Sequence, residues 1–221
     1  MVKGVLEQCH KLIVLLLMSR VDLFTDLDKL LSHTPNALCI LQLDHWELSH
    51  KVLFRLGHAL PHLQDENTSH PWEGFPQLKI LKLDWLRRTT WKSIQPFRSR
   101  LLYLSCHGCA SMDDGVCRGL DSCLALDLSL TSVSDAGLQT LLDKGAPHLK
   151  LLLLNTKLGN LWCDGQWTPA MLERMQYQRK FKVIETAGYG TTGAAVEDSL
   201  REAFRDSPQV LKYAAKYPVQ P

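Results

Sequence analysis

The chain lacks any long apolar run. No stretch of its 221 residues approaches the roughly 20 apolar positions that a membrane span requires. It also lacks an excess of one charge, because 25 Lys and Arg are balanced by 23 Asp and Glu, which gives a formal net charge of +2. So small a charge gives no electrostatic reason to expect nucleic acid or a membrane surface as a partner. The hydrophobic content of 45% is nevertheless enough to bury a sizeable core in one domain.

The cysteines lack the pattern of a disulfide framework or a zinc site. Their count of seven is odd, and a chain of this size does not need disulfides to fold. We therefore expect reduced thiols in an intracellular, cytoplasmic protein, with the nucleus or mitochondria as alternatives. Cys106 and Cys109 form one C-x-x-C pair around His107, but the second matched pair that zinc sites use is missing. We expect no metal and no cofactor, and no cysteine catalysis, since inward-facing thiols are poorly ionised.

What the chain does have is one spacing, repeated. The pattern L-x-x-L-x-L, with cysteine replacing one leucine in two copies, occurs at residues 12–17, 38–43, 78–83, 101–106, 123–128 and 149–154. Consecutive copies start 22 to 26 residues apart, except where a polar insertion at 62–76 lengthens one interval. The spacing suits a short strand whose alternate residues face inward, followed by a turn and a helix that packs behind it. One such unit cannot bury its apolar face alone, so the copies must stack.

The unit at 126–141, LDLSLTSVSDAGLQTL, resembles the cysteine-containing subclass of the leucine-rich repeat family, which is familiar from F-box adaptors. The resemblance implies an α/β solenoid of horseshoe shape, with parallel strands on the concave face and helices on the convex face. It also implies that Cys109 satisfies the backbone of a turn and that the protein recognises substrates for a ubiquitin ligase. Residues 1–9 leave no room for an F-box. Nothing before Val5 is long enough to be the polar cap that terminal repeats normally carry, so we expect a fragment, an alternative start or an end covered by a partner.

Two regions follow from this pattern: about six repeats at 1–159 and a helical C-terminal cap at 160–221. The third repeat is expected to have a short helical part at 90–97, Ser134 is a suitable N-cap for the helix of the fifth repeat, and Thr168 with Pro169 predicts a helix at 169–181. Further helices are expected at 25–35, 49–60, 194–206 and 208–217. We expect the cap to cover the open end of the array with Trp162, Trp167, Leu172 and Met175.

Two segments have alternative interpretations. Residues 12–18 have the outline of a signal-peptide core, because Lys3 precedes them and Ser19 follows, but the run is short for such a core and we favour a strand. The pattern Gly188-Tyr-Gly190-Thr-Thr-Gly193 is typical of dinucleotide-binding turns. The second strand with an acidic residue roughly 20 positions later is missing, so a flexible turn is the favoured interpretation.

Strand residues that do not face inward would line the concave face in columns. One column reads Leu16, Gln42, Lys82, Ser105, Asp127, Leu153, and the next reads Met18, Asp44, Asp84, His107, Ser129, Asn155. The three carboxylates lie on different repeats, too dispersed for paired acid and base catalysis, but they suit a basic peptide segment. Trp85 is the tryptophan best placed to anchor a partner. The candidate binding residues are Gln42, Asp44, Lys82, Asp84, Trp85, Tyr103, Ser105, His107, Asp127, Ser129 and Asn155, with a solvated face that has no partner as the alternative.

The function that we expect is non-enzymatic binding of another protein, with substrate recognition for a ubiquitin ligase as the leading role. One alternative is an assembly or coupling factor, because small repeat proteins associated with mitochondrial ATP synthase, such as coupling factor B, are similar in size and subclass. The other is a nucleotide-binding enzyme that uses Gly188–Gly193. The sequence leaves the oligomeric state open.

Overall fold

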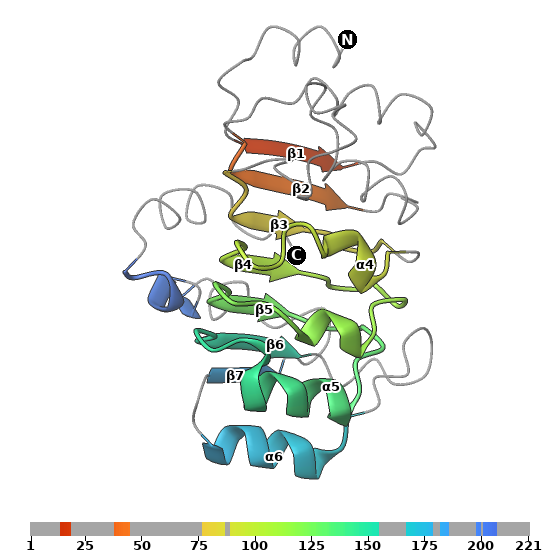
Figure 1. Cartoon of the computed structure of the whole chain (residues 1–221), viewed down its shortest axis with the longest axis vertical. Helices are drawn as coiled ribbons and strands as arrows, with labels where there is room; N and C mark the ends of the chain where they lie inside the picture. The colour runs from red at the N-terminus through yellow and green to blue at the C-terminus, as the bar shows by residue number, and fades with distance from the viewer. Residues whose placement is uncertain are drawn as a thin grey trace, which may run out of the picture.

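The strands that the structure describes form one parallel sheet. The computed structural model describes residues 14–18, 38–44, 77–86, 89–154, 167–178, 182–185, 198–199 and 201–206. Seven strands pair in chain order, each parallel to its neighbours (Figure 1). They are β1 (Val14–Met18), β2 (Ile40–Asp44), β3 (Ile80–Lys82), β4 (Tyr103–Ser105), β5 (Ala125–Asp127), β6 (Leu151–Leu154) and β7 (Lys182–Glu185). With helices packed against the sheet, the protein has an α/β fold.

The first six strands overlap the six predicted segments, so the prediction that these segments pair as adjacent parallel strands is confirmed. The seventh strand was not expected in the sheet. The predicted helix at 169–181 ends at Gln178, and the chain then returns to pair as β7 beside β6. The sheet therefore extends into the region where we expected only a helical cap.

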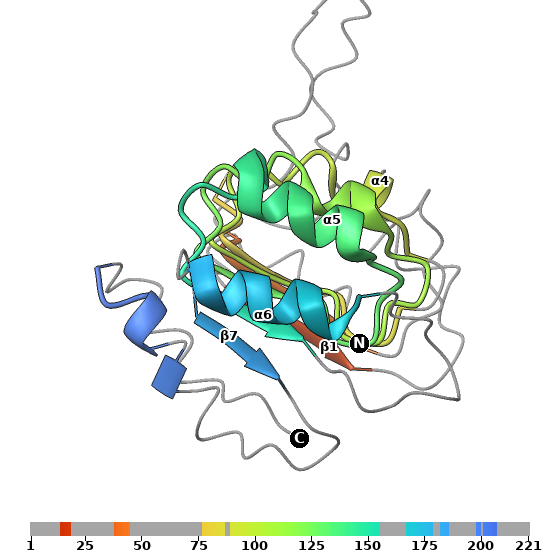
Figure 2. The same cartoon turned by 90° about the horizontal axis from the view of Figure 1, so that it is seen from below.

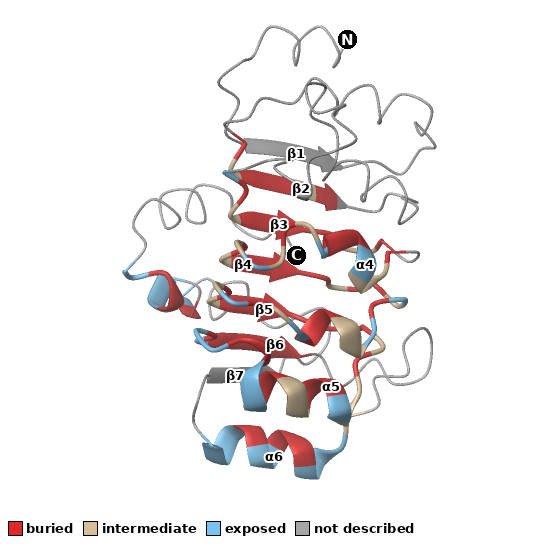
Figure 3. Ribbon diagram, viewed as in Figure 1, coloured by how far each residue is buried: buried red, intermediate tan, exposed pale blue. Residues whose placement is uncertain are grey.

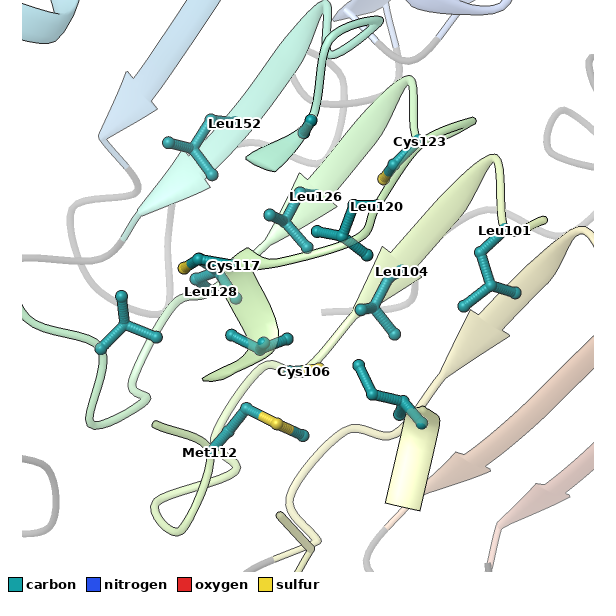
Figure 4. Packing of buried hydrophobic residues seen from close by; sticks show 14 of the residues in the cluster. Leu101, Leu104, Cys106, Met112, Cys117, Leu120, Cys123, Leu126, Leu128 and Leu152 are labelled. Carbon is teal, nitrogen blue, oxygen red and sulfur yellow. The ribbon is translucent and has the colours of Figure 1, made fainter. Parts of the chain in front are cut away.

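The second leucine of each motif occupies the same register position in the sheet. Leu41, Leu81, Leu104, Leu126 and Leu152 are aligned across β2 to β6. Each is at most 2% exposed, and the labelled Leu104, Leu126 and Leu152 point to the same side in Figure 4. We call this side the first face of the sheet and the opposite side the second face. Alternation along the strands assigns neighbouring residues to the second face.

Short helices cover the first face (Figure 2). They are α4 (Trp91–Ile94), the 3₁₀ turn η1 (Asp114–Cys117), α5 (Asp135–Thr140), the π turn η2 (Leu141–Gly145) and α6 (Pro169–Gln178). Their apolar residues join the strand leucines in one buried cluster, which includes Leu172 and Met175 of α6. Trp167, which is partly buried, packs against this cluster. The burial is continuous from β2 to α6 (Figure 3). Among the described residues, no helix has the length and apolarity needed to cross a membrane.

A ladder of carboxylates joins one helix start to the next. Ser134 caps α5 as predicted, because its Oγ accepts a hydrogen bond from the backbone N–H of Ala136. Asp114, in η1, accepts two further bonds from Ser134, from its backbone N–H and from its hydroxyl, both at 2.6 Å. Asp135 in turn accepts bonds from the N–H and the hydroxyl of Thr168, the residue before α6, at 2.7 and 2.8 Å. The same contact therefore recurs between consecutive helix starts. The caps Ser134 and Thr168 were predicted from the sequence, whereas the carboxylates of Asp114 and Asp135 were not.

The turn after three consecutive strands has the same left-handed backbone. Trp85 has φ +62°, Gly108 +70° and Leu130 +57°. Only glycine adopts this conformation freely, and other residues pay about 1–2 kcal/mol. The recurrence at equivalent positions indicates that β3, β4 and β5 leave the sheet by one common path.

The cysteine prediction is confirmed at three positions. Cys106 and Cys123, which replace strand leucines, are fully buried on the first face. Cys109 donates its thiol hydrogen to the carbonyl oxygen of Leu83, on the neighbouring unit, so it satisfies the backbone of a turn.

Several predictions fall outside the described residues. They concern the helices at 25–35, 49–60 and 208–217, the insertion at 62–76, the glycine pattern at 188–193, Trp162 and Asn155.

Candidate functional site

The predicted outward column exists. Parallel register aligns Gln42, Lys82, Ser105, Asp127 and Leu153 on β2 to β6. The next column follows from two backbone bonds beyond the strand ends, Trp85 N–H to the carbonyl of His107 at 2.7 Å and Gly108 N–H to the carbonyl of Ser129 at 2.9 Å. Together the two columns place six side chains in a block on the second face, which we call the polar cluster: Lys82, Asp84, Ser105, His107, Asp127 and Ser129.

Hydrogen bonds tie the polar cluster together across strands. The hydroxyl of Ser105 donates to Oδ1 of Asp84 at 2.5 Å. On the other side, Oδ1 of Asp127 accepts from the backbone N–H of Ser129 at 2.9 Å, and its Oδ2 lies 3.8 Å from Nδ1 of His107. Lys82 places its Nζ 5.9 Å from the ring centroid of Tyr103. Each carboxylate therefore has a partner from a neighbouring strand or turn.

The electrostatics of the cluster are dominated by burial. Burial raises the pKa of Asp84 above its ordinary value, and the negative charge of Asp127 raises that pKa further. The pKa of Asp127 is also raised by burial, although His107 and Ser129 partly oppose the rise. Asp84 and Asp127, which belong to different strand segments, therefore lie close enough for the charge of Asp127 to raise the pKa of Asp84. Residues from different strands meet because parallel register places them side by side around Ser105.

Trp85 lies half-buried at the edge of the cluster. Its ring packs edge-on against His107, with ring centroids 5.3 Å apart and an interplanar angle of 70°. It also lies directly over Gly108, where a Cβ would be 2.6 Å from Cε3 of the indole. The absence of a side chain at Gly108 thus makes room for the indole, and Trp85 as a whole residue is half-buried.

The second face also carries an apolar column that the sequence analysis missed. The first residues of β2 to β6 are Ile40, Ile80, Tyr103, Ala125 and Leu151, aligned in register. All are at most 5% exposed. They form one buried cluster with Leu153, Ala203 and Phe204. The segment containing Phe204 comes from near the C-terminus and lies on the side of the sheet opposite to α5 (Figure 2).

This arrangement corrects the expectation of an open concave surface. Lys82, Ser105 and Asp127 are only 8, 2 and 9% exposed, and Tyr103 and Ser129 are buried as well. The physical reason is the apolar column, which gains by being covered, and Phe204 covers part of it. The signal was readable, because the first strand position is apolar in every one of these copies and the segment at 198–206 spaces its small and aromatic residues on one side of a helix.

The remaining predicted residues are placed as follows. Asp84, Trp85, His107 and Gln42 are half-buried and keep part of their surface accessible. The side chain of Asp44 and all of Asn155 lie outside the described residues. The structure therefore brings together seven of the predicted residues, namely the six of the polar cluster and Trp85. They lie next to Tyr103, whose ring contacts that of Phe204.

Nucleophilic chemistry has little support at the thiols. Burial raises the pKa of Cys123 to about 12, and it raises the pKa values of Cys106 and Cys117 as well. A thiolate is the reactive form, so these side chains are poor nucleophiles. Within the part of the chain that the structure describes, no group of three or more His, Cys, Asp or Glu is placed to hold a metal ion.

No protein-family model and no curated protein matches the chain. The functional argument therefore rests on the geometry of the second face.

Proposed function

We propose that the protein is a leucine-rich-repeat solenoid that binds another protein, without catalysis, through the second face of its sheet. Three recurrences support the repeat assignment: the leucine column, the left-handed turn after β3, β4 and β5, and the carboxylate ladder between helix starts. In a repeat array each unit packs only on its neighbours, so equivalent residues make equivalent contacts. In a fold whose strand connections are unrelated to one another, these contacts would not recur at equivalent positions.

The observation that carries the binding proposal is the composition of the polar cluster. Two carboxylates with raised pKa values, Asp84 and Asp127, are accompanied by one lysine. Buried charge is costly unless it is paired, so an approaching cation would gain from this surplus. The half-buried indole of Trp85 lies beside it, and tryptophan is among the residues that most often dominate binding energies. A basic segment of a partner protein fits this combination best.

The test is affinity capture from a cell extract with the full chain as bait, followed by mass spectrometry. We compare the wild type with a variant that carries Asp84→Lys and Trp85→Ala. The matched control carries the same kinds of change on the exposed surface of α6, Glu173→Lys and Tyr177→Ala, where Tyr177 is 87% exposed. We expect specific proteins to be lost from the first variant and retained by the control.

Circular dichroism checks that both variants are folded, because an unfolded variant would lose its partners for a reason unrelated to the binding site. Asp84→Asn provides a milder change that removes the charge and little volume. If the wild type, the cluster variants and the control capture the same proteins, the second face is not the binding site. The identity of the captured proteins then separates the two roles: ubiquitin-ligase components support substrate recognition, and ATP synthase subunits support a coupling or assembly factor.

A further inference from the structure

The loop that follows α4 carries an arginine that no carboxylate neutralises. Arg98 lies in this loop, which leads from α4 into β4, and it is half-buried. Among the described residues, no carboxylate lies within ion-pair distance of Arg98, and its guanidinium donates no hydrogen bond to the protein. Burial of a charge is unfavourable unless the charge is paired. An anion that reached this guanidinium would therefore supply a partner that the protein itself does not provide.

Two contacts position the side chain of Arg98. Its Cζ lies 5.9 Å from the ring centroid of Trp91, a distance at which the face of an indole attracts a cation. The guanidinium also lies over Gly119 of the next unit, where a Cβ would be 2.9 Å from Nε of Arg98. Trp91 in turn lies over Gly115, which has no side chain to exclude the indole. Contacts within its own unit and with the next one thus set the place of the guanidinium.

A second arginine lies next to this position, on the neighbouring unit. Arg118 directly precedes Gly119 in the chain and is exposed. In the part of the chain that the structure describes, it has no ion-pair partner. Arg100 differs, because its Nη2 donates to the carbonyl oxygen of Pro96 at 3.3 Å and it is engaged within its own loop. We call Arg98 and Arg118 the arginine site.

The described carboxylates of the same unit form no ion pair with the arginine site. Asp113 accepts a hydrogen bond from a backbone N–H at 2.9 Å, and Asp114 accepts two bonds from the next unit. Asp121 is exposed, and it lies within ion-pair distance of neither arginine. The positive charge of the site is therefore left for an external anion.

The chemistry of the site favours a carboxylate as that anion. A guanidinium presents five N–H donors in a planar fork, which matches the two oxygen atoms of a carboxylate. Nucleic acid fits less well, because its binding usually neutralises several phosphates and stacks bases on accessible aromatic rings. The site has only two arginines, and the indole of Trp91 is already in contact with Arg98 and Gly115.

We propose that the arginine site binds an acidic segment of a partner protein, with one carboxylate held by Arg98 and a second by Arg118. The site lies in the loops that lead into β4 and β5, whereas the polar cluster lies where β3, β4 and β5 end. Parallel strands place these two groups at opposite ends of the strands. The arginine site is thus a second binding surface, of opposite charge, and it does not depend on the polar cluster.

The test measures binding of fluorescein-labelled peptides to the full chain by fluorescence anisotropy. One peptide alternates glutamate with serine, and the control peptide has glutamine in place of every glutamate. We expect the wild type to prefer the glutamate peptide, and Arg98→Glu with Arg118→Glu should weaken its binding by about 10-fold or more. The matched control, Arg174→Glu with Arg205→Glu, makes the same change in charge at exposed positions on α6 and near the C-terminus. It should bind the glutamate peptide as the wild type does.

Arg98→Lys separates a positioned guanidinium from general attraction between opposite charges. Lysine keeps the charge but lacks the planar fork, so the affinity for the glutamate peptide should fall by about 3-fold or more although the net charge is unchanged. Circular dichroism checks that each variant is folded. If Arg98→Glu unfolds the chain, Arg98→Lys and the single change Arg118→Glu, at an exposed position, decide the matter.

The proposal is overturned if the wild type binds the two peptides equally or binds neither. It is also overturned if the control variant loses as much affinity as the site variant, or if Arg98→Lys binds as the wild type does. Tighter binding of a fluorescein-labelled oligothymidine than of the glutamate peptide, lost in the site variant, would assign the site to nucleic acid instead. The capture experiment on Asp84 and Trp85 leaves the arginine site unchanged, so either proposal can fail while the other stands.

Discussion

Replacement of Asp114 by alanine should destabilise the protein by about 2 kcal/mol. The carboxylate accepts two hydrogen bonds from Ser134, from its N–H and its hydroxyl, both at 2.6 Å. Hydrogen bonds to a charged group contribute about 1.5–3 kcal/mol each when buried, but Asp114 is half-buried and the two bonds share one residue, so the sum is discounted. For a chain of this length, a loss of about 2 kcal/mol lowers Tm by about 4–8 °C.

Urea unfolding measures this change, and a double-mutant cycle with Ser134→Ala isolates the contact itself. We expect a coupling energy of about 1 kcal/mol, because either single change removes the hydrogen bond between the Ser134 hydroxyl and Oδ2 of Asp114. Asp114→Asn should lose less, since its amide oxygen can still accept from the N–H of Ser134. The control is Asp121→Ala, an exposed carboxylate, which should change stability by less than about 0.5 kcal/mol. A coupling energy near zero, or a loss at Asp114 no larger than at Asp121, would refute the reasoning that the ladder joins consecutive units.

Two further predictions concern the second face. Gly108→Ala should destabilise the protein by about 1 kcal/mol more than Gly119→Ala does. Both glycines have a left-handed backbone, but a Cβ at Gly108 would lie 2.6 Å from the indole of Trp85, whereas the neighbour of Gly119 is the flexible side chain of Arg98. Urea unfolding of the two variants tests this, and equal losses would contradict it. Burial raises the pKa of Asp127 in the folded protein above its ordinary value of about 3.9. Its protonation therefore stabilises the folded state fully at pH values below the ordinary pKa, and this stabilisation is lost as the pH rises through the folded pKa. The stability of Asp127→Asn relative to the wild type should therefore increase from pH 4 to pH 7 in urea unfolding; a difference that is constant, or that falls with pH, would mean that the folded pKa is not raised.

The strand positions and their alignment could be predicted because they depend on local spacing. Leucine at alternate positions fixes which side of a strand is buried, and a nearly constant interval places equivalent residues in register. The alignment of Lys82, Ser105 and Asp127 follows directly from this rule. The cap at Ser134 was also predictable, since it needs only a hydroxyl residue before an apolar helical pattern.

The remaining features depend on contacts between residues far apart in the chain. The strand β7, which pairs beside β6, does not contain the leucine motif that predicted the other strands. The buried cluster around Phe204 combines strand residues with a C-terminal segment, and local periodicity says nothing about which surfaces meet. The left-handed turn at Trp85 contradicts the preference of a bulky residue, and is imposed by the path that the neighbouring units share. The sequence therefore predicted which residues lie on the second face, but not that several of them are buried.

The order of the strands has a consequence for how the chain acquires its structure. Every described strand pairs only with the strands that flank it in the chain, but each parallel pairing must close a loop that contains a whole crossover connection, and such pairings form slowly. The buried cluster around Phe204 combines Tyr103, Ala125 and Leu151 from three strands, so it can form only after those strands have paired.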